Sequence, residues 1–332
     1  MAAEEQAKEL PQILILGPPS IFPYLESQFS NRFLFLKPWL YNLPLTQFLT
    51  SYAQSTQALL IRGGGNTQLT STIIDCLPSL KLVVTSSVGV DHLDFPELRR
   101  RGVAIANAGN LFSEDTADMA GGGVAVGLLI DVLRKISAGD RFVRQGLWSK
   151  KEDFPPGLKL SGKRIGIVGL GKIGSEVAKR LEGFGCKISY NSRTKKSMAP
   201  YSYYPNVYEL AANTEALIIC CALTKETYHL INKEVMLALG KDGVIVNIGR
   251  GLIIDEKEMI RCLTQGEIGG AGLDVFENEP NVPEELFNLD NVVLSPHAAV
   301  MTYESKVELS KLVVNNLEAF FSNKPLVSPV VD

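Results

Sequence analysis

The sequence predicts an α/β protein with two doubly wound parallel-sheet domains, and three observations lead to this prediction. Short apolar, β-branched runs recur along the 332 residues with helical patterns between them, which is typical of βαβ units. The length favours two domains, because single cores seldom grow beyond about 250–300 residues. A glycine-rich phosphate-binding pattern occurs only in the second series of strands, which indicates that the two sheets have different tasks.

The order of the predicted elements gives the domain organisation. The expected strands lie at 12–16, 58–62, 81–85, 103–106, 164–168, 187–190, 216–221, 244–248, 270–273 and 292–294. An amphipathic helical pattern at 302–321 follows the last strand and is free to pack back on the first domain. We therefore expect a discontinuous first domain at 1–108 and 299–332, and a second domain at 109–298.

Composition and charge argue against several classes of function. Apolar residues make up 45% of the chain and charged residues 21%, as in ordinary folded proteins. The net charge is −3 and the longest basic run is Arg99-Arg100-Arg101, so no nucleic-acid partner is expected. No apolar stretch reaches the roughly 18–20 residues that span a bilayer and the N-terminus is acidic, so we expect no membrane partner and a cytosolic (cytoplasmic) protein. The five cysteines match neither a disulfide framework nor zinc spacing, and no metal is expected.

A G-x-G-x-x-G pattern marks a candidate dinucleotide site. It lies at Gly169, Gly171 and Gly174, between the strand at 164–168 and a helical pattern. Gly169 permits a tight turn, Gly171 lets a pyrophosphate approach the backbone, and Gly174 lets the helix pack close to the strand. The alternative is a glycine-rich turn without a ligand. We expect cofactor contacts from Gly169, Leu170, Gly171, Lys172, Ile173 and Gly174.

The next strand predicts which dinucleotide is preferred. An NAD site places Asp or Glu after this strand, but here the chain continues as Asn191-Ser192-Arg193-Thr194-Lys195-Lys196. An arginine flanked by hydroxyls and lysines can neutralise and hydrogen-bond a 2′-phosphate. The alternative is a solvated basic loop. We expect NADP(H) to be preferred over NAD(H), with Ser192, Arg193 and Thr194 as contacts.

Three polar residues near strand ends form the candidate catalytic set. Arg250 follows a strand and stands between glycines, which suits a bidentate clamp on a carboxylate, although a structural salt bridge is the alternative. His297 follows a strand and a proline among small residues, and an imidazole suits proton transfer near neutral pH. Glu279 is the candidate carboxylate that would stabilise its imidazolium form. His92 and His229 are expected to be structural, the commoner role for a lone histidine.

Taken together these segments closely resemble the D-isomer-specific 2-hydroxyacid dehydrogenases over essentially the whole chain. GLGKIG, NIGRG, GLDVFENEP and SPHAA occur in the order of that family, which is more specific than any one motif. SVGVDHLD at 87–94, NAGN at 107–110, YNSRTKK at 190–196 and the ending FFSNKPLVSPV are most similar to plant glyoxylate/hydroxypyruvate reductases and related hydroxyphenylpyruvate reductases.

The resemblance implies an architecture, an activity and roles for individual residues. A Rossmann NADP-binding domain would be inserted in a flavodoxin-like substrate domain, and the protein would be a homodimer that reduces small 2-oxo acids such as glyoxylate and hydroxypyruvate to D-2-hydroxy acids. Val88 and Gly89 would offer amides to the substrate carboxylate, Arg250 would hold the carboxylate and keto oxygen, and His297, oriented by Glu279, would protonate that oxygen. The implied cofactor contacts also include Thr116, Ala222, Thr227, Ile248, Gly249, Arg250, Asp274, His297 and Ala299.

One segment departs from the pattern of the family. The stretch Met119-Ala120-Gly121-Gly122-Gly123-Val124 is about five residues longer than in relatives, where an alanine leads directly into an apolar helix. An insertion of this length predicts a bulge, kink or loop at the glycines, and it bears on the implied dimer.

Two rival functions stay open at this stage. Within the family, a hydroxyphenylpyruvate reductase would need space for an aryl group, which the sequence does not decide. Outside enzymes, a non-catalytic dinucleotide sensor resembling corepressor relatives would use the same fold to bind partners. The joint presence of Arg250, Glu279 and His297 favours catalysis.

Overall fold

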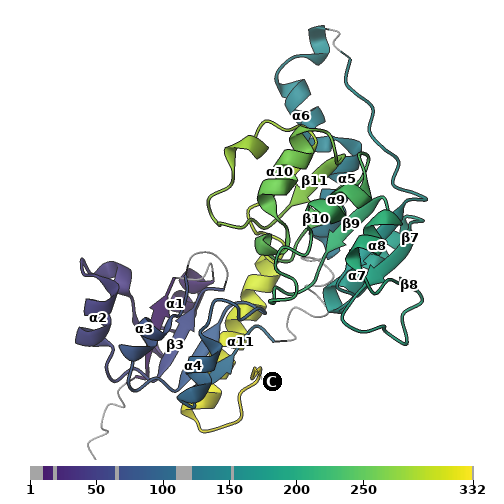
Figure 1. Cartoon of the computed structure of the whole chain (residues 1–332). Helices are drawn as coiled ribbons and strands as arrows, with labels where there is room; N and C mark the ends of the chain where they lie inside the picture. Colours follow the sequence, from purple (N-terminus) through teal and green to yellow (C-terminus); the bar gives the residue numbers. More distant parts are fainter. Residues whose placement is uncertain (1–9, 18–20, 64–66, 110–121, 151–152, 331–332) are drawn as a thin grey trace, which may run out of the picture. The chain divides into compact units, whose positions relative to one another are not determined.

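A computed structural model describes residues 10–17, 21–63, 67–109, 122–150 and 153–330. The chain divides into two compact units (Figure 1). Unit 1 comprises Met1–Phe112 and Thr302–Asp332, and unit 2 comprises Ser113–Met301.

Unit 1 contains a five-stranded parallel sheet. Its strands are β1 (Gln12–Leu16), β2 (Leu34–Leu36), β3 (Ala58–Ile61), β4 (Leu82–Thr85) and β5 (Ala104–Ala106), in the order β2-β1-β3-β4-β5. This is the flavodoxin-like strand order. The apolar side chains of β1, β3 and β4 are buried on both faces, as expected for parallel strands that are covered by helices on both sides.

Helices cover both faces of this sheet. The pair α1 (Phe22–Phe29) and α11 (Tyr303–Phe321) shares one apolar core with it. The helices α2 (Leu45–Tyr52), α3 (Ser71–Asp75) and α4 (Phe95–Arg100) share the other core, and η1 (Pro38–Leu40) precedes α2. The final helix packs on this sheet, because Leu309, Val313 and Leu317 of α11 are buried in the same core as its strands.

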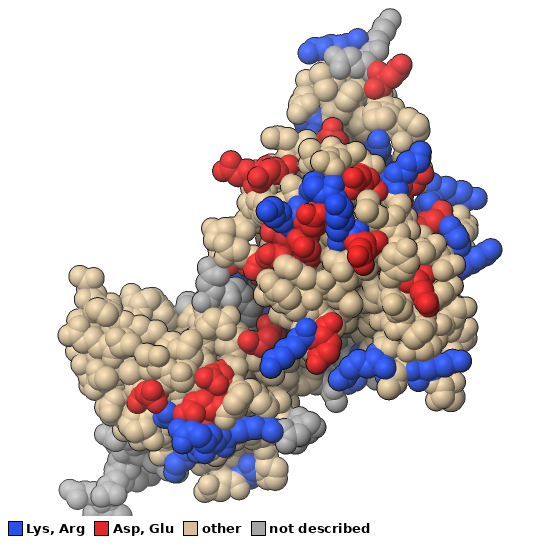
Figure 2. Space-filling view, viewed as in Figure 1, with Lys and Arg blue, Asp and Glu red and all other residues tan. Residues whose placement is uncertain are grey.

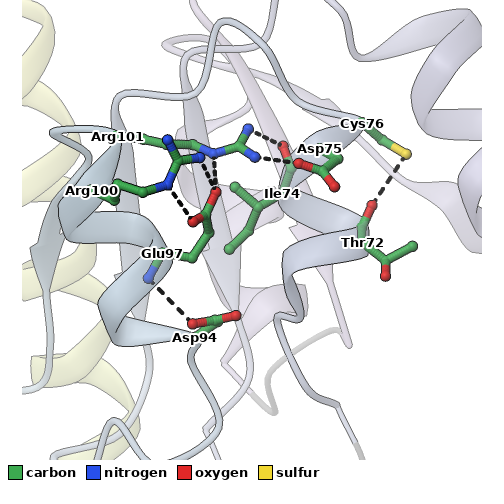
Figure 3. Close-up of polar contacts among 8 residues, drawn as sticks. All are labelled: Thr72, Ile74, Asp75, Cys76, Asp94, Glu97, Arg100 and Arg101. Atoms are coloured by element: carbon green, nitrogen blue, oxygen red, sulfur yellow. Dashed lines mark hydrogen bonds and ion pairs between the residues drawn. The ribbon is translucent and has the colours of Figure 1, made fainter.

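A charged network ties α3 to α4 in unit 1 (Figure 3). Glu97 accepts hydrogen bonds from Arg100 at 2.7 Å and from Arg101 at 2.6 Å. Arg101 also donates to the Ile74 carbonyl at 3.1 Å and pairs with Asp75. The hydrogen bonds from Arg100 and Arg101 lower the pKa of Glu97 to about 2. Arg100 and Arg101 of the basic run therefore form ion pairs within the unit.

Unit 2 contains a seven-stranded parallel sheet with a doubly wound order. Its strands are β6 (Arg164–Val168), β7 (Lys187–Asn191), β8 (Ser202–Tyr203), β9 (Ala216–Ile219), β10 (Val244–Asn247), β11 (Gly270–Leu273) and β12 (Val292–Leu294), in the order β12-β11-β10-β9-β6-β7-β8. The order reverses between β6 and β9. Dinucleotides bind outside the carboxyl ends of strands at such a reversal.

Two layers of helices enclose this second sheet. The helices α5 (Gly122–Arg134) and α7 (Lys172–Gly183) share one core, and α8 (Val207–Ala212), α9 (Lys233–Leu239) and α10 (Glu256–Thr264) share the other. The remaining elements of unit 2 are α6 (Ile136–Arg144), η3 (Trp148–Lys150), η4 (Gly251–Ile253) and η5 (Glu284–Leu286).

The predicted fold class is confirmed, with differences in detail. β2 and β8 were not expected, because each is a short edge strand with side chains that are only partly buried. The expected strand at 216–221 ends at Ile219, so Cys220 and Cys221 belong to the turn that follows. The other strand ends agree to within one residue.

The glycine-rich departure is described only in part. Thr116 and Gly121 lie outside the described residues, whereas the other two glycines of the segment, Gly122 and Gly123, are described. They are the first two residues of α5, which is an α-helix from Gly122 to Arg134. A left-handed residue, Lys135 with φ 55°, then separates α5 from α6.

The face of the molecule drawn in Figure 2 carries both acidic and basic side chains. Figure 2 shows acidic and basic side chains interspersed over both units. Among the described residues, no helix has the length and apolar character needed to cross a membrane.

Candidate active site

The loop between β6 and α7 has the backbone of a phosphate-binding turn. Gly169 has φ +97°, and a Cβ there would lie 2.6 Å from the Cys221 amide nitrogen. A Cβ on Gly174 would lie 2.2 Å from the Gly169 carbonyl oxygen, so this glycine permits close packing of helix and strand. At Gly171, the N-cap of α7, an added Cβ would meet open space. The helix N-terminus is therefore accessible to an anion at Gly171, where its amides and dipole favour negative charge.

The basic loop after β7 is held in a defined shape by tyrosines and hydroxyls. The amide of Lys196 donates to the Tyr190 hydroxyl at 2.8 Å, and the Ser192 hydroxyl donates to the Thr194 carbonyl at 2.7 Å. Tyr190 is completely buried, whereas Arg193 is exposed. The loop thus presents a guanidinium to solvent on a fixed backbone.

The loop after β9 supplies two further predicted contacts. The Thr227 hydroxyl donates to the Ala222 carbonyl at 2.8 Å and accepts from the Thr224 amide at 2.7 Å. Hydrogen bonding by the Thr224 hydroxyl is the main cause that lowers the pKa of Glu226, and the positive charge of Arg193 contributes. Arg193 is therefore within electrostatic reach of this loop.

A buried asparagine shapes the turn that carries Arg250. Asn247, 1% exposed at the end of β10, donates to the Arg250 carbonyl at 2.9 Å and accepts from the Gly249 amide at 3.0 Å. Gly251 packs so closely that a Cβ would lie 1.9 Å from the Phe276 carbonyl carbon. The Arg250 guanidinium is half-buried and donates to the Gly249 carbonyl at 2.8 Å. Its backbone is thus fixed on both sides.

Asp274 anchors the segment that carries His297. Its carboxylate accepts from the Ser295 hydroxyl at 2.5 Å, the Ala298 amide at 2.8 Å and the Ala299 amide at 3.0 Å. The Asp274 carbonyl also accepts from the His297 amide at 2.8 Å. The side chain is fully buried, and these bonds offset the cost of burying its charge. Asp274 therefore holds the 295–299 segment in place through these four hydrogen bonds.

His297 and Glu279 form a direct hydrogen-bonded pair. Nδ1 of His297 lies 2.7 Å from Oε2 of Glu279, and Oε1 accepts from the Phe276 amide at 3.2 Å. Burial opposes ionisation of Glu279, but its bond with His297, the His297 charge, the Phe276 amide and the Arg250 charge together hold its pKa below the ordinary value. Because the Arg250 charge acts on Glu279, Arg250 lies within electrostatic reach of the His297–Glu279 pair. An ionised Glu279 can only accept, so Nδ1 carries the proton in this bond.

The loop after β4 in unit 1 contains the predicted carboxylate-binding amides. Its carbonyls at Ser87, Val88 and Gly89 accept from the Ala108 amide at 2.9 Å, the Asn107 side chain at 2.7 Å and the Ser87 hydroxyl at 2.6 Å. No acceptor for the Val88 or Gly89 amide is found in the part of the chain that the structure describes. The turn therefore uses its acceptors internally and leaves donors for an anion.

The structure therefore groups the predicted residues by unit. Unit 2 brings together Arg250, Glu279 and His297, with Ile248, Gly249 and Ala299 beside them in sequence. The glycine loop and the 192–194 loop follow adjacent parallel strands of the same sheet, β6 and β7. Val88 and Gly89 belong to unit 1. Thr116 lies outside the described residues.

Comparison with known proteins gives the family. Residues 126–299 match the D-isomer specific 2-hydroxyacid dehydrogenase, NAD binding domain. A glyoxylate/hydroxypyruvate reductase of Arabidopsis thaliana is 52% identical over 98% of each chain, and a hydroxyphenylpyruvate reductase of Plectranthus scutellarioides is 46% identical over 96% of this chain and 98% of its own. The chain belongs to the D-isomer-specific 2-hydroxyacid dehydrogenases. This oxidoreductase is also similar to an NADPH-dependent glyoxylate/hydroxypyruvate reductase of Sinorhizobium meliloti solved with NADP and malonate, with a TM-score of 0.85, 34% identity and 97% coverage of both chains.

Membership of the family settles the broad chemistry. As a 2-hydroxyacid dehydrogenase, the protein transfers hydride with a nicotinamide dinucleotide, for which unit 2 supplies the binding domain. Sequence reasoning missed two supports of this dehydrogenase, Asn247 and Ser295. Each stands within three residues of a predicted catalytic residue in NIGRG or SPHAA, and that proximity was the available signal.

Proposed function

We propose that this dehydrogenase uses NADPH to reduce small 2-oxo acids, glyoxylate and hydroxypyruvate, to D-2-hydroxy acids. The observation that carries the proposal is the 2.7 Å pair of His297 and Glu279 in the electrostatic neighbourhood of Arg250. A proton donor and a carboxylate anchor are what the reduction of a 2-oxo acid requires.

The residues of the chain have separate tasks in this reaction. Arg250 holds the carboxylate and the keto oxygen, and the amides of Val88 and Gly89 bind the carboxylate. When bound, the reduced nicotinamide supplies hydride to the keto carbon. His297 donates its Nε2 proton to the keto oxygen, so the alkoxide is neutralised as it forms. Glu279 stabilises the imidazolium and holds the ring through Nδ1.

The preference for NADPH rests on the loop after β7. The strand ends with Asn191 and the loop begins with Ser192, so the acidic side chain that binds ribose hydroxyls in NAD sites is missing here, and Arg193 is exposed. A guanidinium matches a 2′-phosphate by charge and by fork geometry. The similar S. meliloti reductase is NADPH-dependent, which supports the same assignment.

A second substrate class is favoured by one relative. The P. scutellarioides protein is named hydroxyphenylpyruvate reductase and is 46% identical to this chain. Reduction of hydroxyphenylpyruvate is therefore the second candidate activity. The non-catalytic sensor is the weaker alternative, because the described site keeps a bonded His297 and Glu279.

We further propose a cytosolic homodimer built through unit 2. Apolar side chains that are at least 38% exposed cluster along α6 and the segment after it: Ile136, Val143, Trp148, Phe154 and Leu158. A run of exposed apolar residues is typical of a surface that another chain covers. Light scattering of the purified protein tests the dimer, and fractionation of cells tests the location.

The test is a substrate panel with both cofactors. Oxidation of NADPH and of NADH is followed optically with glyoxylate, hydroxypyruvate, pyruvate and hydroxyphenylpyruvate. Faster turnover of glyoxylate or hydroxypyruvate with NADPH supports the first proposal, and hydroxyphenylpyruvate as best substrate supports the second. Folded protein that binds NADPH without turning over any of the four contradicts both.

A further inference from the structure

A line of three polar side chains in unit 1 ends on the turn that contains Val88 and Gly89. Nε2 of His92 lies 2.9 Å from Oγ1 of Thr85, which lies 3.0 Å from Oγ of Ser87, which donates to the Gly89 carbonyl at 2.6 Å. Thr85 is completely buried and His92 is 2% exposed. The proposed reaction gives no task to His92 or Thr85.

The chemistry of the groups fixes the direction of this line. A carbonyl cannot donate, so the single hydroxyl proton of Ser87 points to Gly89. Ser87 must then accept from Thr85, whose only proton is used in that bond. Thr85 must in turn accept from His92, so His92 carries a proton on Nε2. The three hydrogen bonds therefore run in one direction: His92 donates to Thr85, Thr85 donates to Ser87, and Ser87 donates to the Gly89 carbonyl.

Because the peptide bond is planar, a hydrogen bond to the carbonyl of one residue also sets the direction of the next residue's amide. In a trans peptide, the carbonyl of one residue and the amide of the next lie in one plane and point in opposite directions. The bonds to the Ser87 and Val88 carbonyls therefore orient the amides of Val88 and Gly89. By the same geometry, the bond to the Gly89 carbonyl orients the amide of Val90. No acceptor for the Val90 amide is found among the described residues.

Close packing keeps Ser87 in its place. A Cβ on Gly63 would lie 2.0 Å from the Cβ and Oγ of Ser87, so only glycine permits this approach. The Gly63 amide also donates to Oγ of Ser86 at 3.3 Å. On the other side, the Asn107 amide group that holds Val88 is tied to the Gly109 amide through its oxygen at 2.8 Å.

We propose that His92 is a positioning residue that acts through Thr85 and Ser87 to fix the Gly89–Val90 peptide, so that the Val90 amide joins those of Val88 and Gly89 in a three-amide site for the substrate carboxylate. This inference rests on the proposed function only in naming the anion as the carboxylate of a 2-oxo acid. It goes beyond the two amides expected from the family resemblance.

The decisive variants differ by one hydroxyl. Thr85→Val keeps the shape of Thr85 and breaks the line, whereas Thr85→Ser keeps the hydroxyl. In the full-length protein, Thr85→Val is expected to raise the KM for hydroxypyruvate about tenfold, because the carboxylate loses one well-aligned donor. The Kd for NADPH should stay unchanged, and Thr85→Ser should remain close to wild type. A purely structural role would instead lower Tm without separating KM from the Kd of NADPH.

Three outcomes would overturn the proposal. These are an unchanged KM in folded Thr85→Val, an equal loss in Thr85→Ser, and a parallel weakening of NADPH binding. If Thr85→Val does not fold, Ser87→Ala at a half-buried position removes the last link of the line and must raise the KM in the same way. If wild type reduces no 2-oxo acid, the proposed function fails, and calorimetric binding of malonate to wild type and to Thr85→Val still decides the inference: tenfold weaker binding by the variant supports it and equal binding refutes it.

Discussion

Glu279 holds His297 with one carboxylate oxygen and the backbone with the other. Oε2 lies 2.7 Å from Nδ1 of His297, and Oε1 accepts from the Phe276 amide at 3.2 Å. Both oxygens have a partner, so the carboxylate cannot rotate without losing a bond. The imidazole therefore has a defined orientation, in which Nδ1 is bound to Glu279.

The first prediction concerns this pair. His297→Gln should lower kcat by about 100-fold or more while NADPH binding is retained, because only the proton donor is removed. Glu279→Gln should lower kcat, because the imidazole loses the carboxylate that accepts from Nδ1 and stabilises the imidazolium. His229→Gln is the matched control, since His229 also pairs with a carboxylate, that of Glu277 at 2.8 Å. Wild-type turnover by His297→Gln would remove this residue from the mechanism.

The second prediction concerns cofactor choice. Arg193→Ala should weaken NADPH binding about tenfold or more and leave NADH binding nearly unchanged, because the charge-assisted bonds to the 2′-phosphate exist only with NADPH. Lys179→Ala, on the exposed face of α7, is the control for a general loss of positive charge. Fluorescence titration of both cofactors gives the comparison, and equal losses for the two would sink the phosphate assignment.

The third prediction concerns Asp274 as the anchor of the 295–299 segment. Asp274→Asn keeps the volume of a fully buried side chain but turns one acceptor into a donor facing the Ala298 or Ala299 amide. The free energy of unfolding should fall by about 2 kcal/mol, as for other lost bonds to buried charged groups. Because the 295–299 segment carries His297, kcat should fall as well. Chemical denaturation and steady-state kinetics check the two effects, and full activity in a destabilised variant would show that the anchor does not position His297.

The fourth prediction concerns acid stability. The pKa of Glu97 is lowered to about 2 by Arg100 and Arg101, so its stabilising contribution is present above the ordinary value of 4.5 and is lost as pH falls toward 2. Glu97→Gln should therefore have a slightly lower Tm than wild type at pH 7, and the difference should shrink steadily below pH 4.5. The effect stays small because ion pairs open to solvent are weak. Calorimetry across pH, with Glu209→Gln as control, checks this, and a Tm difference independent of pH would contradict it.

Much of the architecture is readable from the sequence, for identifiable reasons. Buried parallel strands such as β4 and β9 are largely apolar runs. In GLGKIG, Gly169 forms a tight turn, Gly171 leaves open space for a ligand, and Gly174 packs against the Gly169 carbonyl. The edge strands β2 and β8 escape notice because they are only three and two residues long, too short to form a recognisable run. The fold class and the family are confirmed, whereas the roles of individual site residues remain predictions.

The supporting contacts of the site could not be predicted from sequence. The bond from Ser295 to Asp274 joins residues 21 positions apart, and only the fold brings them together. The line from His92 to Ser87 is local in sequence, but its direction follows from which atoms are within bonding distance. His92 was therefore expected to be merely structural.

The central claim is that the protein reduces a 2-oxo acid to a D-2-hydroxy acid with NADPH as the hydride donor. The most direct measurement incubates the wild-type protein with NADPH and hydroxypyruvate, and determines the amount and configuration of the glycerate formed. We expect one molecule of D-glycerate for each NADPH oxidised. L-Glycerate, or oxidation of NADPH without glycerate, would contradict it.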